Sequence, residues 1–212
     1  MVEIDFFFDY SCPWSYLAFI RLLETATRTG APIVWKPVVV DWVLKQANPT
    51  LAKSRVESNS RKAKYHEKDL SDWAKFCDVT IAYLPQPPVE AVQALCGASL
   101  AADQGQIVPY SRGVFRAHFG AGEDIADLRT LCRIAEGAGM SSEDFERDLV
   151  EGAALERIQE NTNELLARGG FGSPTLFVGD AMYFGNDRMP LVEFAVGQAS
   201  GRKFVPPGDH YA

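Results

Sequence analysis

Several features that commit a protein to a membrane or to nucleic acid are absent from this sequence of 212 residues. Its apolar runs, such as Phe6–Phe8 and Val38–Val40, fall far short of the ~20 residues that a membrane-spanning helix needs. Positive charge is not in excess, because 21 Lys and Arg residues stand against 28 Asp and Glu residues and leave a formal charge of −7. We therefore expect neither membrane insertion nor the electrostatic attraction on which non-specific nucleic-acid binding depends.

The four cysteines and three histidines are few and far apart. The cysteines, Cys12, Cys77, Cys96 and Cys132, include no CxxC pair, and no Cys or His residues have the spacing of a structural metal site. The segment Met1–Asp5 has two acids and none of the basic residues with which a secretory signal begins. These absences predict a cytoplasmic protein with reduced thiols and no structural metal.

The residues that are present are those of a folded globule, with 47% hydrophobic and 23% charged side chains. Pro13 opens a helical pattern that Gly30 ends, and residues 32–35 form a second β-rich segment. Before that helix, apolar residues alternate as in a strand at Val2, Ile4, Phe6 and Phe8. Strand, helix, strand is the pattern of a βαβ unit with parallel strands.

The middle of the chain, from about residue 42 to residue 167, has almost no strand signal and several apolar helical faces. Ser141 and Asp144 form a capping box at one expected helix start, and the polar stretch 45–64 is expected to be a long loop. β-rich character returns at 174–178 and 181–184, which predict a hairpin around Gly179-Asp180, followed by a last helix. The helical block is large enough to be a subdomain inserted between the two β-containing parts.

The candidate for chemistry is Cys12, which lies between the first strand and the first helix. Open α/β sheets bind ligands at the carboxyl ends of their strands, and a helix start stabilises an anion. We therefore expect the Cys12 thiol to be biased toward the thiolate, the nucleophilic form. The alternative is that Cys12 is a small apolar residue that only fills the helix start.

A second candidate element is the segment Gly172-Ser173-Pro174-Thr175. Alone, Pro174 reads as an ordinary trans proline at the start of a strand. Together with the C-P-x-S helix start, it suggests a thioredoxin-like fold, in which a cis proline lies against the active-site helix. We therefore predict an α/β, thioredoxin-like fold with a large all-helical insertion. The thioredoxin-like domain would comprise residues 1–41 and 168–212, and the inserted helical subdomain residues 42–167.

Two motifs at opposite ends of the chain resemble those of one family. The run from Phe8 to Ala18, FDYSCPWSYLA, resembles the opening FDxxSPxSYLA of the 2-hydroxychromene-2-carboxylate isomerases, which belong to the DsbA-like, kappa-class glutathione transferase family. The runs FGSPTLFV, from Phe171, and YFGNDR, from Tyr183, resemble the close FGxPTxxV…xFGxDR of that family. The resemblance therefore extends from one end of the sequence to the other.

The resemblance implies a glutathione site. Cys12 matches the catalytic serine, whose hydroxyl supports the glutathione thiolate. Ser173, which precedes the matched cis proline Pro174, would offer backbone hydrogen bonds to the cysteinyl part of glutathione. The remaining matches are Asn186 and Asp187 for the γ-glutamyl end, and Asn48 and Lys62 for the glycyl carboxylate. The last two matches are weak, because the 45–64 stretch departs from the family spacing and Lys62 is equally compatible with a solvated surface lysine.

The family also implies an activity: glutathione-dependent isomerisation of a small aromatic oxo-acid, carried out by a homodimer. This sequence has Cys12 where the family has a serine, and a cysteine can also form a mixed disulfide with glutathione. Other functions therefore stay open. The chain would then be a monothiol DsbA-like oxidoreductase or a kappa-class glutathione transferase. Ser15 takes the place of a resolving cysteine, and Ser11 is either the working hydroxyl or a cap of the helix. A non-catalytic thioredoxin-like binding module is a third possibility.

Overall fold

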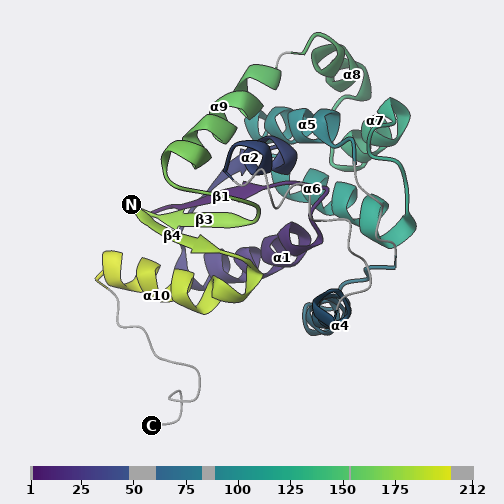
Figure 1. Ribbon diagram of the computed structural model, residues 1–212. Coiled ribbons are helices and arrows are strands. Elements are labelled where there is room, and N and C mark those ends of the chain that lie inside the picture. The colour runs from purple at the N-terminus through teal and green to yellow at the C-terminus, as the bar shows by residue number, and fades with distance from the viewer. Residues whose placement is uncertain (1, 48–60, 83–88, 153, 202–212) are drawn as a thin grey trace.

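The computed structural model describes residues 2–47, 61–82, 89–152 and 154–201 (Figure 1). Its strands belong to one sheet, which is enclosed by helices. In chain order the elements are β1 (Ile4–Phe8), α1 (Pro13–Thr29), β2 (Ile33–Pro37), α2 (Val40–Ala47), α4 (Arg61–Phe76), α5 (Val92–Asp103), α6 (Ile107–Phe115), the π-helical turn η1 (Arg116–Gly120), α7 (Leu128–Gly137), α8 (Ser142–Val150), α9 (Leu155–Ala167), β3 (Thr175–Val178), β4 (Ala181–Phe184), the 3₁₀ turn η2 (Asn186–Arg188) and α10 (Met189–Ala199).

The sheet is mixed, with the strand order β2-β1-β3-β4. β1 and β2 are parallel, with Phe6 opposite Trp35, as the βαβ pattern predicts. β3 runs antiparallel to β1 and to β4, and the hairpin turns at Gly179, whose φ of +58° suits a residue without a side chain. Because β1 is central, its carboxyl end, and the start of α1 beyond it, lie in the middle of the fold.

Both faces of the sheet are covered because β1 is apolar on both sides. Alternation along β1 turns Ile4, Phe6 and Phe8 toward one face, where they share a core with side chains of α1 and α10. Phe7 turns to the other face and packs with Val43 of α2 and with other residues of α9 and β3. Figure 1 shows the resulting layers, with α1 and α10 on one side of the sheet and α2 and α9 on the other. The predicted thioredoxin-like α/β fold is confirmed.

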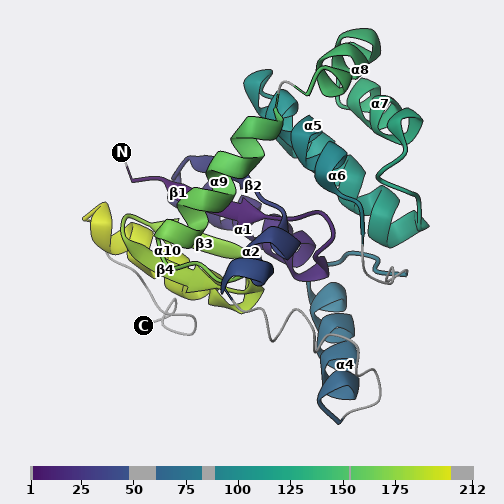
Figure 2. The ribbon, with the colours of Figure 1, turned by 45° about the horizontal axis from the view of Figure 1, so that its top comes forward.

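The regular elements described between β2 and β3 are all helical, again as predicted. Figure 2 shows α5 and α6 side by side, α7 and α8 farther out, and α4 projecting from the rest. The expected cap at Ser141 is present, since its hydroxyl accepts a hydrogen bond from the Asp144 N–H. The expected loop at 45–64 is wrong at both ends, because α2 continues to Ala47 and α4 begins at Arg61. Residues 48–60 lie outside the described part, and the domain boundaries stay a prediction.

None of the helices that the structure describes is long and apolar enough to cross a membrane. The helical block has a tightly packed interior instead, as Gly97 of α5 illustrates. A Cβ at this position would fall on the hydroxyl of Tyr110 and lie 2.8 Å from Cζ of Phe145. Both rings are fully buried, and the Tyr110 hydroxyl donates to the Ala94 carbonyl at 3.3 Å. Gly97 is therefore required for the close packing of α5 against α6 and α8.

Substituting Gly97→Ala should lower the free energy of unfolding by about 1–3 kcal/mol, the usual cost of overpacking a core. The sign of this change is informative, because helix propensity alone predicts the opposite: alanine stabilises a helix by about 1 kcal/mol relative to glycine. Gly137→Ala is the matched control, since Gly137 ends α7 and a Cβ added there would meet no other atom within 4 Å. Urea unfolding should find the control unchanged or slightly stabilised. A Gly97→Ala protein as stable as the control would contradict this account of the packing.

Candidate functional site

The candidate site begins where β1 ends and α1 starts. Cys12 is the N-cap residue of α1, with an extended backbone, and Pro13 occupies the first turn. The Cys12 carbonyl accepts hydrogen bonds from the N–H groups of Ser15, at 3.0 Å, and Tyr16, at 3.3 Å. Within the described residues no side chain caps this helix, so the expectation that Ser11 caps it is wrong. The N-terminal N–H groups of α1 are therefore next to the Cys12 side chain.

The segment before β3 packs directly on this helix start. The peptide bond between Ser173 and Pro174 is cis, as the thioredoxin-like resemblance implies. The Cys12 thiol donates to the Ser173 carbonyl at a sulfur–oxygen distance of 3.3 Å, and the hydroxyls of Ser15 and Ser173 are 2.7 Å apart. Ser15 is fully buried, whereas Cys12 is half-buried. Cys12 is thus the more accessible of the two side chains, and Ser15 holds Ser173 in place.

A buried carboxylate lies just behind Cys12. Asp9 is only 1% exposed, and its two oxygens accept hydrogen bonds from the N–H of Ser11, at 2.8 Å, and the N–H of Val40, at 2.7 Å. Val40 is the first residue of α2, so Asp9 connects the β1–α1 turn to a second helix start. Burial raises the pKa of Asp9, and the hydrogen bonds from Val40 and Ser11 oppose that rise.

The protonation state of Cys12 differs from the sequence-based expectation. Burial raises the pKa of the Cys12 thiol, and the negative charge of Asp9 adds to the rise. The N–H groups of Ser15 and Trp14 favour the thiolate, but they do not outweigh the loss of water. The expected bias toward the thiolate is therefore wrong for the free protein. Cys12 is a neutral S–H group that can donate a hydrogen bond.

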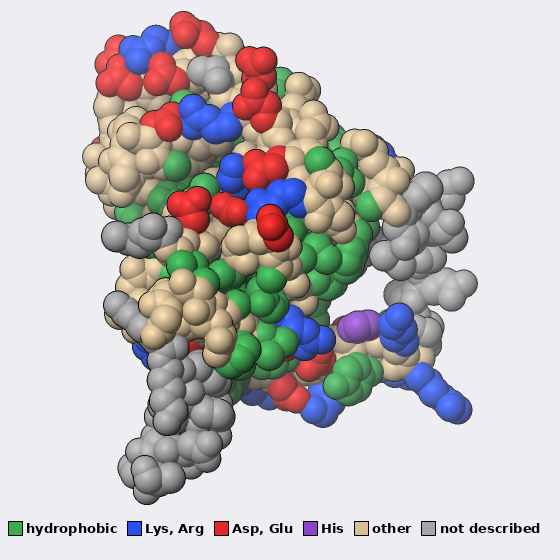
Figure 3. Space-filling model, turned by 90° about the vertical axis from the view of Figure 1, so that its left-hand side faces the viewer, with side chains coloured by type: hydrophobic (Ala, Val, Ile, Leu, Met, Phe, Trp, Pro, Cys, Tyr) green, Lys and Arg blue, Asp and Glu red, His purple; other side chains and the backbone are tan. Residues whose placement is uncertain are grey.

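A cavity of about 300 Å³ opens beside this helix start. In Figure 3 this face of the molecule is hollowed between α4 and the body of the protein. Four residues predicted from sequence line the cavity: Ser173, Pro174, Asn186 and Asp187. Sequence reasoning did not place six others there: Trp14 of α1, His66, Asp69 and Trp73 of α4, Phe184 of β4, and Gly185. The cavity therefore has apolar indole walls and a few polar groups, which is typical of a small-molecule site.

One wall of the cavity is held by Arg21, a residue that the sequence reasoning missed. Its guanidinium donates to the backbone carbonyl of Asn186 and, at 3.3 Å, to the Asn186 side-chain Oδ1. The same guanidinium lies 4.6 Å from the centre of the Trp73 ring, a cation–π distance. Gly185, with φ +98°, precedes Asn186, and a Cβ there would lie 2.9 Å from Oδ1 of Asp187. Arg21 thus joins α4 to η2 across the cavity.

The remaining predicted residues lie in other positions. None of the three predicted catalytic residues Ser11, Cys12 and Ser15 lines the cavity itself, and the Ser11 N–H donates to Asp9. Lys62 is exposed on the first turn of α4 and is also absent from the lining. Asn48 lies outside the described residues. Asp187 does line the cavity, and its carboxylate is 2.6 Å from the Arg188 guanidinium.

Comparisons with known proteins agree with this geometry. Residues 3–197 match the family model of the DSBA-like thioredoxin domain. The sequence is 31% identical to a 2-hydroxychromene-2-carboxylate isomerase of Pseudomonas putida, over 92% of this chain and 94% of that protein. It is 25% identical to glutathione S-transferase kappa 2 of Caenorhabditis elegans, over 89% of each. A solved structure of a 2-hydroxychromene-2-carboxylate isomerase has a TM-score of 0.78 and 28% identity, covering 93% of this chain and 96% of that chain.

Alkylation of Cys12 by iodoacetamide should be slow at neutral pH, because its pKa is raised and only the thiolate reacts. The pH profile of the Cys12 peptide, followed by mass spectrometry, should have its inflection above about 8.5, the ordinary value for a cysteine thiol. The same peptide in the urea-unfolded chain provides the reference. An inflection below that reference would mean that the helix start dominates over burial.

Proposed function

The chain belongs to the 2-hydroxychromene-2-carboxylate isomerase family of DSBA-like thioredoxin domains, and we propose that it is a glutathione-dependent isomerase of 2-hydroxychromene-2-carboxylate-type acids. The product would be of the trans-o-hydroxybenzylidenepyruvate type, formed during the degradation of aromatic compounds. The observation that carries this proposal is the half-buried Cys12 thiol at the start of α1, which donates to the Ser173 carbonyl beside the cis Ser173-Pro174 bond.

The cavity beside Cys12 supports glutathione as the cofactor. Its γ-glutamyl end carries an ammonium and a carboxylate, and Asp187 supplies an acidic group for the ammonium at the far wall. Ser173, held by Ser15 at 2.7 Å, presents its backbone for the cysteinyl part of the tripeptide. The glutathione sulfur would then lie over the first turn of α1, where the N–H groups of the helix stabilise negative charge.

In the proposed reaction no atom is gained or lost. When bound, glutathione would supply a thiolate for reversible conjugate addition to the carbon–carbon double bond of the ring-opened oxo-acid, which would allow rotation to the trans isomer and return the thiolate unchanged. The protein has to stabilise the thiolate and hold the two reactants together.

The neutral state of Cys12 favours this function over the alternative in which Cys12 itself is the nucleophile. A thiol of raised pKa is a weak nucleophile but remains a hydrogen-bond donor, which is what the matched serine hydroxyl of the family would provide. A second cysteine that could resolve a mixed disulfide is also distant in sequence. We therefore assign Cys12 the role of donor to the glutathione thiolate. The homodimeric state and the cytoplasmic location stay predictions.

Two substitutions of Cys12 separate the proposed roles. Cys12→Ser should keep isomerase activity within about tenfold of the parent, because a hydroxyl also donates, whereas Cys12→Ala should lose about 100-fold or more. The ultraviolet absorbance change of 2-hydroxychromene-2-carboxylate, with and without glutathione, measures both. Cys132→Ser, which changes a buried thiol on α7, controls for the loss of a thiol elsewhere.

Two outcomes would contradict the proposal. The first is that the parent protein with glutathione leaves the substrate unchanged, which would mean that it lacks the isomerase activity. The second is that Cys12→Ser is inactive while the intact mass of the parent protein shows a glutathione adduct at Cys12. That second result would assign the chain to the monothiol oxidoreductases.

Arg21→Lys should weaken glutathione binding about tenfold with little change in kcat, because Arg21 acts through Asn186, away from the sulfur. Lysine keeps the charge but loses the planar group that contacts Asn186 and Trp73 together. Arg28→Lys, on the same helix and paired with Glu193 at the surface, is the matched control. A fall in kcat at constant glutathione KM would contradict the positioning role.

A further inference from the structure

Two arginines outside the Cys12 cavity have no acidic partner among the described residues. Arg112 lies on α6 and Arg116 begins the π-helical turn η1 that continues it, so the two are one helical turn apart. Within the described residues, no Asp or Glu oxygen lies within 4.0 Å of a guanidinium nitrogen of either arginine. Like charges at this spacing repel each other, and the chain as a whole is acidic. Arg112 is half-buried and Arg116 is exposed, so both guanidinium groups are free to bind an anion from solution.

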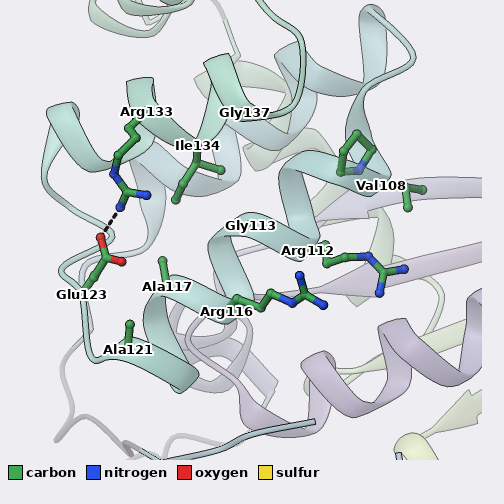
Figure 4. A pocket seen from close by; sticks show the side chains of 11 residues that line it. Val108, Arg112, Gly113, Arg116, Ala117, Ala121, Glu123, Arg133, Ile134 and Gly137 are labelled. Atoms are coloured by element: carbon green, nitrogen blue, oxygen red, sulfur yellow. Dashed lines mark hydrogen bonds and ion pairs between the residues drawn. The ribbon is translucent and has the colours of Figure 1, made fainter. Parts of the chain in front are cut away.

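The two arginines form the ridge between two hollows, of about 560 and 490 Å³, and line both of them. Each volume is within the range of small-molecule sites. In the first hollow, Figure 4 shows Arg133 paired with Glu123 at one end, while the guanidinium groups of Arg112 and Arg116 point away from that pair. Glu123 is thus already neutralised within the same hollow.

The lining of the two hollows combines polar and apolar groups. The second hollow contains the buried phenol of Tyr16, whose pKa is raised by burial and is held down by the charges of Arg116 and Arg112. It also contains the exposed acid Asp78, whose backbone has a φ of +51° and which, within the described residues, pairs with neither arginine. In the first hollow Ile134 packs against Gly113, where a Cβ would lie 2.6 Å from the Ile134 Cγ2 atom. The missing side chain at Gly113 lets α7 approach α6 closely at Ile134.

The backbone at Arg116 gives a second, independent sign of a site. A π-helical turn replaces the α-helix over Arg116–Gly120, and such turns occur frequently at functional positions because they re-aim the side chains that they carry. Guanidinium groups bind carboxylate and phosphate oxygens through paired hydrogen bonds. We propose that Arg112 and Arg116 form a binding site for a small organic anion, whose carboxylate or phosphate group lies between the two guanidinium groups. This site is separate from the Cys12 cavity and does not depend on the proposed reaction.

Calorimetry at low ionic strength tests the site with three probes: phthalate, phenyl phosphate and inorganic phosphate. Phthalate or phenyl phosphate should bind the parent protein, and Arg112→Gln and Arg116→Gln should each weaken that binding about tenfold. Arg129→Gln, which removes one exposed positive charge from α7, should leave it unchanged. The tighter of the two organic probes identifies the ligand as a carboxylate or a phosphate ester.

Protection from phenylglyoxal locates the site without relying on variants. The bound organic probe should protect Arg112 and Arg116 of the parent protein from modification, as mapped by mass spectrometry, and leave Arg129 reactive. Three results would overturn the proposal: no binding of either organic probe, binding of inorganic phosphate alone, or equal affinity of Arg112→Gln, Arg116→Gln and Arg129→Gln proteins. Protection of neither arginine by a bound probe would overturn it as well.

Discussion

The candidate site depends on the contact between the start of α1 and the segment that precedes β3. Two hydrogen bonds make this contact, from the Cys12 thiol to the Ser173 carbonyl and between the hydroxyls of Ser15 and Ser173, across more than 150 residues of sequence. The sheet makes it possible, because β1 pairs with β3 and brings both segments to the same end. Without this contact neither the thiol nor the cis proline would have a defined place beside the cavity.

Much of the fold could be predicted because local sequence and tertiary structure agree along β1 and α1. Alternation of Ile4, Phe6 and Phe8 against Phe7 matches a strand covered on both faces, and Pro13 and Gly30 bound the helix as expected. The end motifs then identified the cavity residues near Ser173 and Asp187, because these lie in short segments beside predicted strands. The helix α4 was partly missed, since its first turn is as polar as the loop expected there.

What could not be predicted depends on distances between remote parts of the chain. Arg21 has no local signal, because its partners Asn186 and Trp73 come from η2 and α4 and meet only in the folded protein. The protonation state of Cys12 was mispredicted for a related reason. The helix start is visible in the sequence, but the burial that outweighs it and the charge of buried Asp9 are tertiary properties. The same holds for the two arginines on α6 and η1, whose separation from the carboxylates of the described residues follows from packing alone.

The central claim is that Cys12 acts as a hydrogen-bond donor to a glutathione thiolate and not as a nucleophile. A crystal structure of the protein grown with glutathione tests this most directly. The account predicts an intact tripeptide in the cavity beside Trp14 and Asp187, with its sulfur within hydrogen-bonding reach of the Cys12 Sγ atom but not bonded to it. A sulfur–sulfur bond of about 2.05 Å to Cys12, or a glutathione sulfur held by Ser11 with Cys12 turned away, would contradict it.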